Sequence, residues 1–323
     1  MKKIAVFTSG GDSPGMNACV RAVVRAGIHY GLEVFGVKRG YKGMIDGDFV
    51  KMDAMMVSNI IQRGGTILLS SRSDRFRTKE GRQQAYEKVK AAGIEGIVAI
   101  GGNGTFAGAR IFSEEFDIPV IGVPGTIDND LYGTDKTIGY DTALNTIVEA
   151  IDKIRDTADS HNRVFFVEVM GRDAGFLALN SGIAGGVESI LIPEIEDDFL
   201  NLVQLLKKGW KRVKSSLIVL IAEGDEEGGA VKVAEQLRGK FPDLETRVVI
   251  LGHLQRGGRP SCYDRVLATR LGVSAVEALI NGQSDIMVGE INNVVVPTPL
   301  EKAVKQHHEF DKGKLHLLDI MSD

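Results

Sequence analysis

The chain alternates short apolar runs with longer segments of helical spacing. Eight runs have the length of buried β-strands: IAVF at 4–7, EVFGV at 33–37, GIVAI at 96–100, PVIGV at 119–123, RVFFVEV at 163–169, SILI at 189–192, SLIVLIA at 216–222 and RVVIL at 247–251. Most are continuously apolar, which is typical of parallel strands covered on both faces. The pattern predicts an α/β protein of βαβ units around mainly parallel sheets.

Helical spacing is clearest in the middle of the chain. Leu144, Ile147, Val148, Ile151 and Ile154 form one apolar stripe, which predicts a helix from about residue 140 to residue 160. Further helices are predicted at 16–30, 79–92, 105–115, 199–214 and 261–280. The more polar segment from residue 300, which contains His307 and His308, is predicted to form a C-terminal helix and tail.

Length and composition limit the class of protein. The 323 residues are 43% hydrophobic and 25% charged, which predicts two packed globular domains. The net charge of −4 with interspersed signs argues against a nucleic-acid or membrane surface, because either needs a basic face. No run approaches the ~20 apolar residues of a membrane span. The apolar run after the first two lysines is too short for the hydrophobic region of a signal peptide. Cys19 and Cys262 lack the spacing of a metal site or of a disulfide framework, which fits the reducing cytoplasm. The expected binding partner is a small molecule.

Three predicted strands end in glycine and polar residues. These ends are TSGGDSPGMN at 8–17, IGGNGTFAG at 100–108 and VPGTIDND at 123–130. The carboxyl ends of parallel strands open on one edge of a sheet, where glycine backbone and helix N-termini bind phosphate groups. Together the three turns predict a polyphosphate ligand, whereas any one of them alone is explained equally well by a tight chain reversal.

Two common nucleotide sites do not fit. Gly102, Gly104 and Gly108 resemble a dinucleotide fingerprint, but the next strand ends in Pro124 and Gly125, where a ribose-binding acid is expected. The P-loop pattern GxxxxGK[ST] occurs nowhere in the chain. Neither an NAD site nor an ordinary Walker site is therefore expected.

Acids and arginines accompany these turns. Asp128 and Asp130 flank Asn129, and on an extended chain both carboxylates face one side, so one could accept a proton while the other addresses a metal. An Asx-rich turn is the alternative. Arginines beside glycine turns suit bidentate phosphate contacts, although each one separately is better explained by a surface ion pair. The candidates are Arg63, Arg72, Arg75, Arg77, Arg163, Arg172, Arg247 and Arg256, the last close to His253.

At these residues the sequence resembles the bacterial ATP-dependent 6-phosphofructokinases. The shared motifs follow the family's order over nearly the whole chain: TSGGDSPGMNA, QRGGT, PGTIDND, TIGYDTA, VEVMGR, IAGG and LGHLQRGG. The resemblance implies the phosphofructokinase fold of two Rossmann-like, doubly wound domains. It implies a larger ATP-binding domain from residues 1–139 plus about 255–304, and a smaller fructose-6-phosphate-binding domain from 140–254 plus about 305–323. It also implies a homotetramer whose sugar-phosphate sites lie across subunit contacts.

The resemblance further implies a role for each matching residue. ATP is expected at Gly11, Tyr41, Arg72, Arg77, Gly102, Asn103, Gly104, Thr105 and Gly108. Asp128 matches the base for the sugar 1-hydroxyl, with Thr126, Arg172 and Gly11 beside the transferring phosphoryl group. Fructose 6-phosphate is expected at Thr126, Asp128, Asp130, Met170, Gly171, Arg172, Glu223, His253 and Arg256, with Arg163 and Arg247 coming from a neighbouring subunit. The alternatives are another phosphoryl donor or sugar phosphate, or a catalytically weak regulatory subunit.

Donor and metal expectations depend on three positions. Pyrophosphate-dependent relatives typically carry Asp in place of Gly104 and Lys in place of Gly125, so the space that these glycines leave favours ATP. The family's magnesium ligand is an Asp where this chain has Asn103. Asn103 is thus a weak Mg²⁺ ligand, and Asp130 or waters can complete the metal's shell, so we expect an active enzyme with a raised magnesium requirement.

An effector site is a weaker expectation. Arg21, Arg25, Arg155, Glu188, Arg212 and Lys214 match positions that bind ADP or phosphoenolpyruvate in the family. Ala54 replaces a phosphate-binding Arg, however, Asn59 replaces an Asp, and Ser73 replaces an aromatic residue near the adenine.

Overall fold

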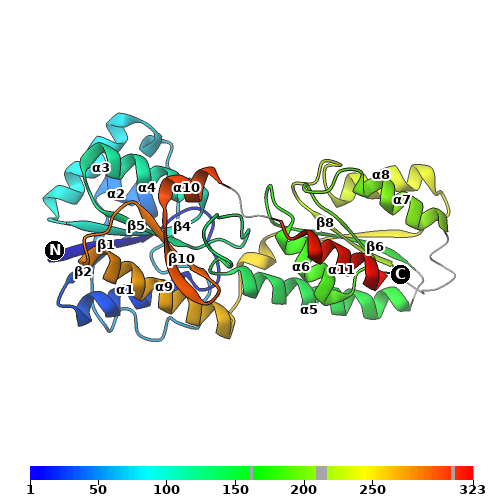
Figure 1. The fold of residues 1–323 in the computed structure, drawn as a ribbon, viewed down its shortest axis with the longest axis horizontal. Helices are drawn as coiled ribbons and strands as arrows, with labels where there is room; N and C mark the ends of the chain where they lie inside the picture. Colours follow the sequence, from blue (N-terminus) through cyan, green and yellow to red (C-terminus); the bar gives the residue numbers. More distant parts are fainter. Residues whose placement is uncertain (161–162, 209–216, 307–309, 323) are drawn as a thin grey trace. The chain divides into compact units, whose positions relative to one another are not determined.

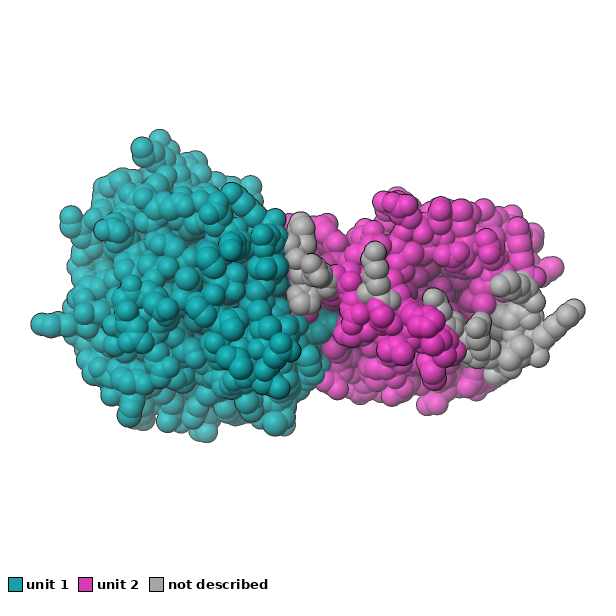
Figure 2. Space-filling view, in the orientation of Figure 1, with its two compact units in different colours: residues 1–127, 131–142, 256–308 teal, residues 128–130, 143–255, 309–323 magenta. Residues whose placement is uncertain are grey.

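The chain divides into two compact units, each built around its own sheet (Figure 2). The computed structural model describes residues 1–160, 163–208, 217–306 and 310–322. Unit 1 comprises Met1–Ile127, Leu131–Thr142 and Arg256–His308, and unit 2 comprises Asp128–Asp130, Ala143–Gln255 and Glu309–Asp323. Among the described residues, no helix is both long and apolar enough to cross a bilayer.

Unit 1 contains a seven-stranded sheet. Its strands are β1 (Lys3–Thr8), β2 (Glu33–Val37), β3 (Phe49–Met52), β4 (Gly96–Gly101), β5 (Val120–Pro124), β10 (Ile286–Ile291) and β11 (Val294–Pro299). They lie in the order β11-β10-β5-β4-β1-β2-β3. The five central strands are parallel, and the two edge strands, β3 and β11, run antiparallel to their neighbours.

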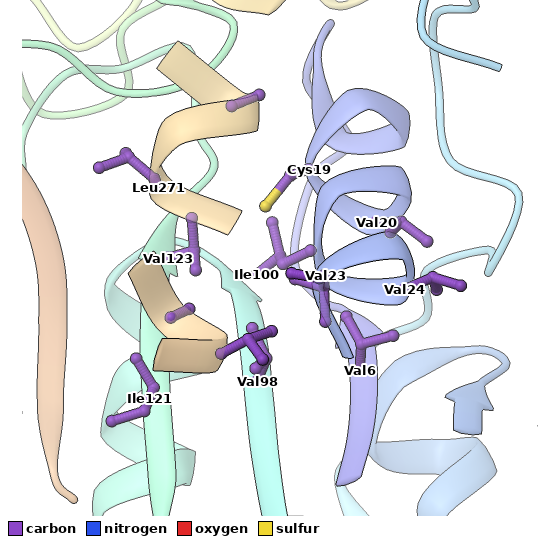
Figure 3. Packing of buried hydrophobic residues seen from close by; sticks show 14 of the residues in the cluster. Val6, Cys19, Val20, Val23, Val24, Val98, Ile100, Ile121, Val123 and Leu271 are labelled. Carbon is purple, nitrogen blue, oxygen red and sulfur yellow. The ribbon is translucent and has the colours of Figure 1, made fainter. Parts of the chain in front are cut away.

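Helices cover both faces of this sheet (Figure 1). They are α1 (Met16–His29), α2 (Gly40–Asp46), α3 (Lys79–Ala91), α4 (Asn103–Phe116), α9 (Cys262–Ile280) and α10 (Leu300–Lys305), with a short 3-10 turn η1 (Arg75–Arg77). Successive strand residues point to opposite faces, so Ile4 and Val6 of β1 pack against α1 and α9, while Ala5 and Phe7 join the core under α2, α3, α4 and α10. Figure 3 shows Cys19 of α1 and Leu271 of α9 above the strand residues Val98 and Ile100.

Unit 2 contains a four-stranded parallel sheet. Its strands are β6 (Val164–Val169), β7 (Ser189–Leu191), β8 (Leu217–Ala222) and β9 (Thr246–Ile250), in the order β7-β8-β6-β9. Its helices are α5 (Tyr140–Asp159), α6 (Phe176–Gly185), α7 (Asp198–Lys208), α8 (Ala230–Lys240) and α11 (Lys312–Ser322), with a 3-10 helix η3 (Gly252–Arg256). Figure 1 shows α7 and α8 on one side of the sheet and α5, α6 and α11 on the other. The first turn of α5 belongs to unit 1 and the remainder to unit 2.

The predicted elements are largely confirmed. All eight apolar runs form strands, and the predicted helices form within a few residues of their expected bounds. The helix expected at 199–214 is described only as α7, because 209–216 lie outside the described residues, as do His307 and His308. Where one C-terminal helix was expected, two form, α10 and α11. The apolar pattern missed α2, α6, α8, β3, β10 and β11, of which β3 and β11 are the edge strands of the unit 1 sheet.

The missed hairpin of β10 and β11 has a local signal in its turn. Asn292 and Asn293 connect the two strands with φ angles of 50° and 62°. A two-residue hairpin turn with both residues in the left-handed region favours Asn and Gly. Pro297 and Pro299 in β11 fit an edge strand, since proline cannot donate a backbone hydrogen bond to a further neighbour.

Candidate functional site

The three glycine-rich turns of unit 1 follow adjacent strands. β1 pairs in parallel with β4, and β4 pairs in parallel with β5, so the turns after these strands share one edge of the sheet. The backbone joins them further: Ser9 N donates to Ile100 O at 3.0 Å, and Gly125 N donates to Gly101 O at 2.9 Å. The prediction that these turns meet at one edge is confirmed.

The turn after β4 leads directly into α4. Gly102 is the N-cap of this helix, no side chain caps it, and its first turn contains no acidic residue. Asn103 is the first helical residue, two positions earlier than the predicted start. A Cβ built on Gly104 has no atom within 4 Å. A helix N-terminus beside open space is an arrangement that favours a phosphate group, because the backbone N–H groups there and the helix dipole attract anions.

Tyr41, Thr105 and Gly108 form a packed cluster beside this turn. The Tyr41 hydroxyl donates to Thr105 O at 2.5 Å, and its ring stacks on Phe76 with centroids 3.9 Å apart. A Cβ on Gly108 would lie 3.1 Å from the Tyr41 ring. Burial raises the pKa of the Tyr41 hydroxyl, which therefore acts as a neutral donor. Through this hydrogen bond, Tyr41 holds Thr105 in the first turn of α4.

Gly11 and Arg256 lie against each other, although Gly11 is expected to bind ATP and Arg256 to bind fructose 6-phosphate. A Cβ on Gly11 would lie 2.2 Å from Arg256 Nη1, so the guanidinium occupies the space beside this glycine. The same nitrogen donates to Asp12 O at 3.4 Å. The turn after β1 therefore has a positive group beside it, supplied by a residue more than two hundred positions later in the chain.

The segment after β5 corrects two expectations. Asn129 has a φ of 55°, so Asp128 and Asp130 are not alternate residues of an extended chain, and the reasoning by which both carboxylates could face one site does not apply. The Cβ direction of Gly125 is filled: Ile100 Cγ2 and Met16 Cε lie 3.0 Å and 3.3 Å away. Gly104 leaves open space as expected, whereas a side chain at Gly125 would crowd Ile100 and Met16.

Other predicted groups of unit 1 are placed as follows. Thr126 and Asp128 are buried, and Thr126 O accepts a hydrogen bond from Thr137 Oγ1 at 2.5 Å. Arg72 and Arg77 are exposed, and Arg77 has a loose ion pair with Asp74 at 3.8 Å. Exposed arginines of this kind are available to an anionic ligand at little cost, since a surface ion pair contributes only about 0–1 kcal/mol.

In unit 2 the strand ends are joined by side chains. Glu223 follows β8, and Arg172 lies in the loop after β6. Glu223 Oε1 accepts a hydrogen bond from Arg172 N at 2.9 Å. Gln255 is fully buried; its Oε1 accepts from Met170 N at 3.1 Å and its Nε2 donates to Gly252 O at 2.9 Å. Sequence reasoning missed Gln255 as a supporting residue, although it lies in the LGHLQRGG motif. Gly171 and Arg172 both have positive φ angles of 142° and 56°, which bend the chain sharply after β6.

Two further arginines of unit 2 share one carboxylate. Arg163 Nε and Arg247 Nη2 lie 2.9 Å and 2.7 Å from Glu245 Oε1. Burial opposes ionisation of Glu245, but the two guanidinium groups outweigh it and lower its pKa. The parallel pairing of β6 with β9 brings the two arginines together. His253, in η3, is exposed.

The predicted effector residues fall into separate groups. Arg21 and Arg25 lie on α1 in unit 1, where burial and the charge of Arg25 lower the pKa of Arg21. In unit 2, Arg155 lies 3.4 Å from Glu188 and donates to Gly185 O and Gly186 O at the end of α6. Arg212 and Lys214 lie outside the described residues.

Buried acids elsewhere in unit 2 have shifted pKa values. Asp198 begins α7, is 7% exposed, and its Oδ2 accepts from Ile192 N at 2.7 Å. Burial, with a contribution from Asp225, raises the pKa of Asp198 to about 7. Across the described part of the chain, no cluster of three or more His, Cys, Asp and Glu side chains has metal-binding geometry.

Comparisons with known proteins agree with this architecture. The family model described as Phosphofructokinase matches residues 3–279. The chain is 54% identical over 319 residues to an ATP-dependent 6-phosphofructokinase of Cytophaga hutchinsonii, covering 99% of this chain and 97% of the relative. It is 56% identical over 322 residues to ATP-dependent 6-phosphofructokinase 1 of Thermus thermophilus, covering 100% of both.

A solved structure gives the same result at the level of the fold. The phosphofructokinase from Saccharomyces cerevisiae matches with a TM-score of 0.88 and 39% identity, over 94% of this chain. This chain spans 45% of the yeast chain's length. The sequence matches over the full length, together with two α/β units of mainly parallel strands, show that the chain belongs to the phosphofructokinase family.

Proposed function

We propose that this protein transfers the γ-phosphoryl group of ATP to the 1-hydroxyl of D-fructose 6-phosphate, giving fructose 1,6-bisphosphate and ADP. The observation that carries the proposal is the full-length similarity to relatives named ATP-dependent 6-phosphofructokinase. The uncapped start of α4 beside three glycine-rich turns supports it, because phosphoryl transfer depends mainly on positioning and on stabilising negative charge.

ATP is assigned to unit 1 and the sugar phosphate mainly to unit 2. Backbone groups of the turns at Gly11 and at residues 102–108 hold the nucleotide phosphates, with Arg72 and Arg77 as exposed cations. Met170, Gly171, Glu223, His253 and Arg256 hold fructose 6-phosphate, and Arg163 and Arg247 complete that site from a neighbouring subunit of a homotetramer. ADP or phosphoenolpyruvate is the proposed effector at Arg21, Arg25, Arg155 and Glu188, with Arg212 and Lys214.

Asp128 is the proposed general base. Its carboxylate accepts the proton of the 1-hydroxyl as the hydroxyl oxygen attacks the γ-phosphorus of ATP, and ADP leaves with the electrons of the broken P–O bond. Thr126 and Arg172 hold the transferring group, and Arg172 contributes positive charge where the transition state is negative. Asp128 is buried, two residues after Thr126 in the segment that follows β5.

Open space at Gly104 supports ATP as the donor. A side chain at this position would project into the space beside the start of α4, where an α-phosphate needs room. Gly125 does not contribute to this argument, because Ile100 and Met16 already fill its side-chain direction. Donor preference is therefore assigned to Gly104 alone.

Magnesium fits the residues that are present, with the nucleotide as its main ligand. Asn103, at the start of α4, would supply an amide oxygen to the ion, and Asp130 would supply a carboxylate oxygen. Mg²⁺ is typically held by one or two protein oxygens together with phosphates and waters. When bound, it neutralises charge on the phosphate oxygens. Because Asn103 has no charge, most of the attraction comes from the triphosphate.

The direct test is a product assay. Purified protein with ATP, Mg²⁺ and fructose 6-phosphate is expected to form fructose 1,6-bisphosphate and ADP in equal amounts, measured by phosphorus NMR. Parallel reactions with pyrophosphate in place of ATP, and with glucose 6-phosphate in place of fructose 6-phosphate, serve as controls. Absence of bisphosphate with ATP, or a faster reaction with pyrophosphate, would contradict the proposal.

A further inference from the structure

A buried carboxylate of unit 1 lies next to the proposed site without being part of it. Asp264, in the first turn of α9, has no exposed surface and accepts three hydrogen bonds. Gly139 N and Thr142 N each donate at 2.8 Å, and Thr142 Oγ1 donates at 2.5 Å. Because both donor residues belong to the segment that opens α5, Asp264 ties the start of α5 to the start of α9.

The hydroxyl groups around Asp264 fix the direction of these bonds. Thr142 Oγ1 accepts from Ser261 N at 2.9 Å, so its one proton is available to Asp264. Ser261 Oγ accepts from Asp264 N at 3.1 Å as the N-cap of α9, and donates to Asp141 Oδ2 at 2.6 Å. Burial raises the pKa of Asp264, whereas its three hydrogen bonds and the N-termini of the two nearby helices favour the ionised form. A network with every donor matched holds its members in one arrangement.

The same segment is bonded on its other side to the loop after β5. Thr137 Oγ1 donates to Thr126 O at 2.5 Å, and Ile138 N donates to Pro124 O at 2.9 Å. Gly125 and Ile138 form an isolated parallel bridge. The position of Thr126, assigned above to the transferring phosphoryl group, therefore depends on where residues 137 and 138 lie.

Residue 139 has little room to move toward the turn after β1. Gly139 has a φ of 104°, and a Cβ on it would lie 2.5 Å from Ser13 Cβ. The chain here is pressed against Ser13 and Pro14 on one side and held by Asp264 on the other. If the bonds to Asp264 were lost, the segment could move only away from Ser13. Its hydrogen bonds would then displace Thr126 and Pro124 with it.

We propose that Asp264 is a positioning residue for phosphoryl transfer: by holding Gly139 and Thr142, it keeps the 137–138 segment, and through it Thr126, in place. This inference rests on the proposed function. Asp264 itself has no exposed surface from which to reach a substrate. Its effect is expected in the rate of the chemical step, because a displacement of about 1 Å in a catalytic arrangement costs roughly 10²-fold in rate.

The test compares kinetic constants of matched variants. Asp264→Asn keeps the size of the side chain but turns one acceptor oxygen into a donor that faces N–H or O–H groups. We expect kcat for fructose 1,6-bisphosphate formation to fall roughly 10- to 100-fold, with the KM values for ATP and fructose 6-phosphate little changed. Ser261→Ala is the control, since it removes the α9 cap but leaves the three bonds to Asp264; it should lower Tm and retain kcat.

A second pair keeps the inference testable if Asp264→Asn does not fold. Thr142→Val removes the hydroxyl donor and should lower kcat, and Thr142→Ser should restore it. A variant of Asp264 or Thr142→Val with lowered Tm and wild-type kcat would show a purely structural role and overturn the inference. Wild-type protein that formed no fructose 1,6-bisphosphate from ATP would instead overturn the proposed function, and the inference with it.

Discussion

The two units present the ends of their parallel strands in different ways. In unit 1, β1, β4 and β5 end in glycine-rich turns, and α4 begins without a side-chain cap. In unit 2, the segments after β6, β8 and β9 are joined by side-chain hydrogen bonds: Arg172 N donates to Glu223, and Met170 N donates to Gln255. One edge offers backbone groups and a helix N-terminus, which suit a polyphosphate, and the other offers charged and amide side chains, which suit a polyhydroxylated sugar phosphate.

The largest effect is expected at Asp128, which follows the β5 turn but groups with unit 2. Asp128→Ser removes the proposed base, and kcat should fall by roughly 10²-fold or more. The exposed Asp243→Ser is a matched control and should behave as wild type. Steady-state assays with both substrates saturating measure the effect. A near-normal kcat for Asp128→Ser would rule out its role as the base.

Glu223→Gln should weaken binding of the sugar phosphate and leave binding of ATP unchanged. The variant keeps the shape of the side chain but loses the charge that strengthens the hydrogen bond from Arg172 N. Hydrogen bonds to a charged group contribute about 1.5–3 kcal/mol and neutral ones about 0.5–1.5, so the exchange costs about 1 kcal/mol and the KM for fructose 6-phosphate should rise roughly fivefold. The KM for ATP should stay near its wild-type value. If both constants rose together, the division of ligands between the units would be wrong.

Asn103→Asp should lower the magnesium requirement. A unit charge about 4 Å from another interacts by roughly 4 kcal/mol at an effective dielectric of ~20, and desolvation offsets much of this. We expect half-maximal activity at a severalfold lower Mg²⁺ concentration. The acid should also stabilise α4 by about 0.3–1 kcal/mol, because it lies in the first turn. Superimposable Mg²⁺ titrations for the two proteins would count against Asn103 as a ligand.

Gly104→Ala tests whether the unit 1 edge recognises ATP through its backbone. No atom lies within 4 Å of the added Cβ, so the variant should fold normally and gain about 0.4–1 kcal/mol through lower entropy of the unfolded chain. The methyl group should nevertheless crowd the nucleotide phosphates at a cost of ~1 kcal/mol, near fivefold in KM for ATP. Thermal unfolding and ATP titration measure the two effects. A raised Tm with unchanged KM would show that ATP does not approach Gly104.

The smallest effect concerns stability in unit 2. The pKa of Asp198 is raised by burial to about 7, above its unfolded value of about 3.9, so its contribution to stability is complete below pH ~4 and is lost as pH rises through 7. Asp198→Asn stays neutral and can still accept from Ile192 N. The free energy of unfolding of the variant should therefore exceed that of wild type by about 1–2 kcal/mol at pH 8, after allowance for solvent screening, and by less at pH 5. An equal Tm difference at both pH values would contradict this.

The sequence located the unit 1 turns well because their signals are local. Continuous apolar runs predicted parallel strands, and parallel strands that neighbour one another must bring their carboxyl ends to one edge. The same reasoning failed at Asn129, where a left-handed residue breaks the extended chain. It also misjudged Gly125, because the crowding by Ile100 and Met16 depends on packing between elements.

Element order, the parallel sheets and the glycine-rich turns thus follow from local sequence, since periodicity and turn chemistry act over a few residues. Contacts between distant segments do not. Arg256 reaches Asp12 across 244 positions, and Asp264 reaches Gly139 across 125. Both contacts exist only because the chain returns to unit 1 after β9 and places α9 beside α1. Periodicity and turn signals do not predict that return, which the family resemblance alone implied. The side-chain contacts that hold the glycine-rich edge of unit 1 in place became visible only in the folded structure.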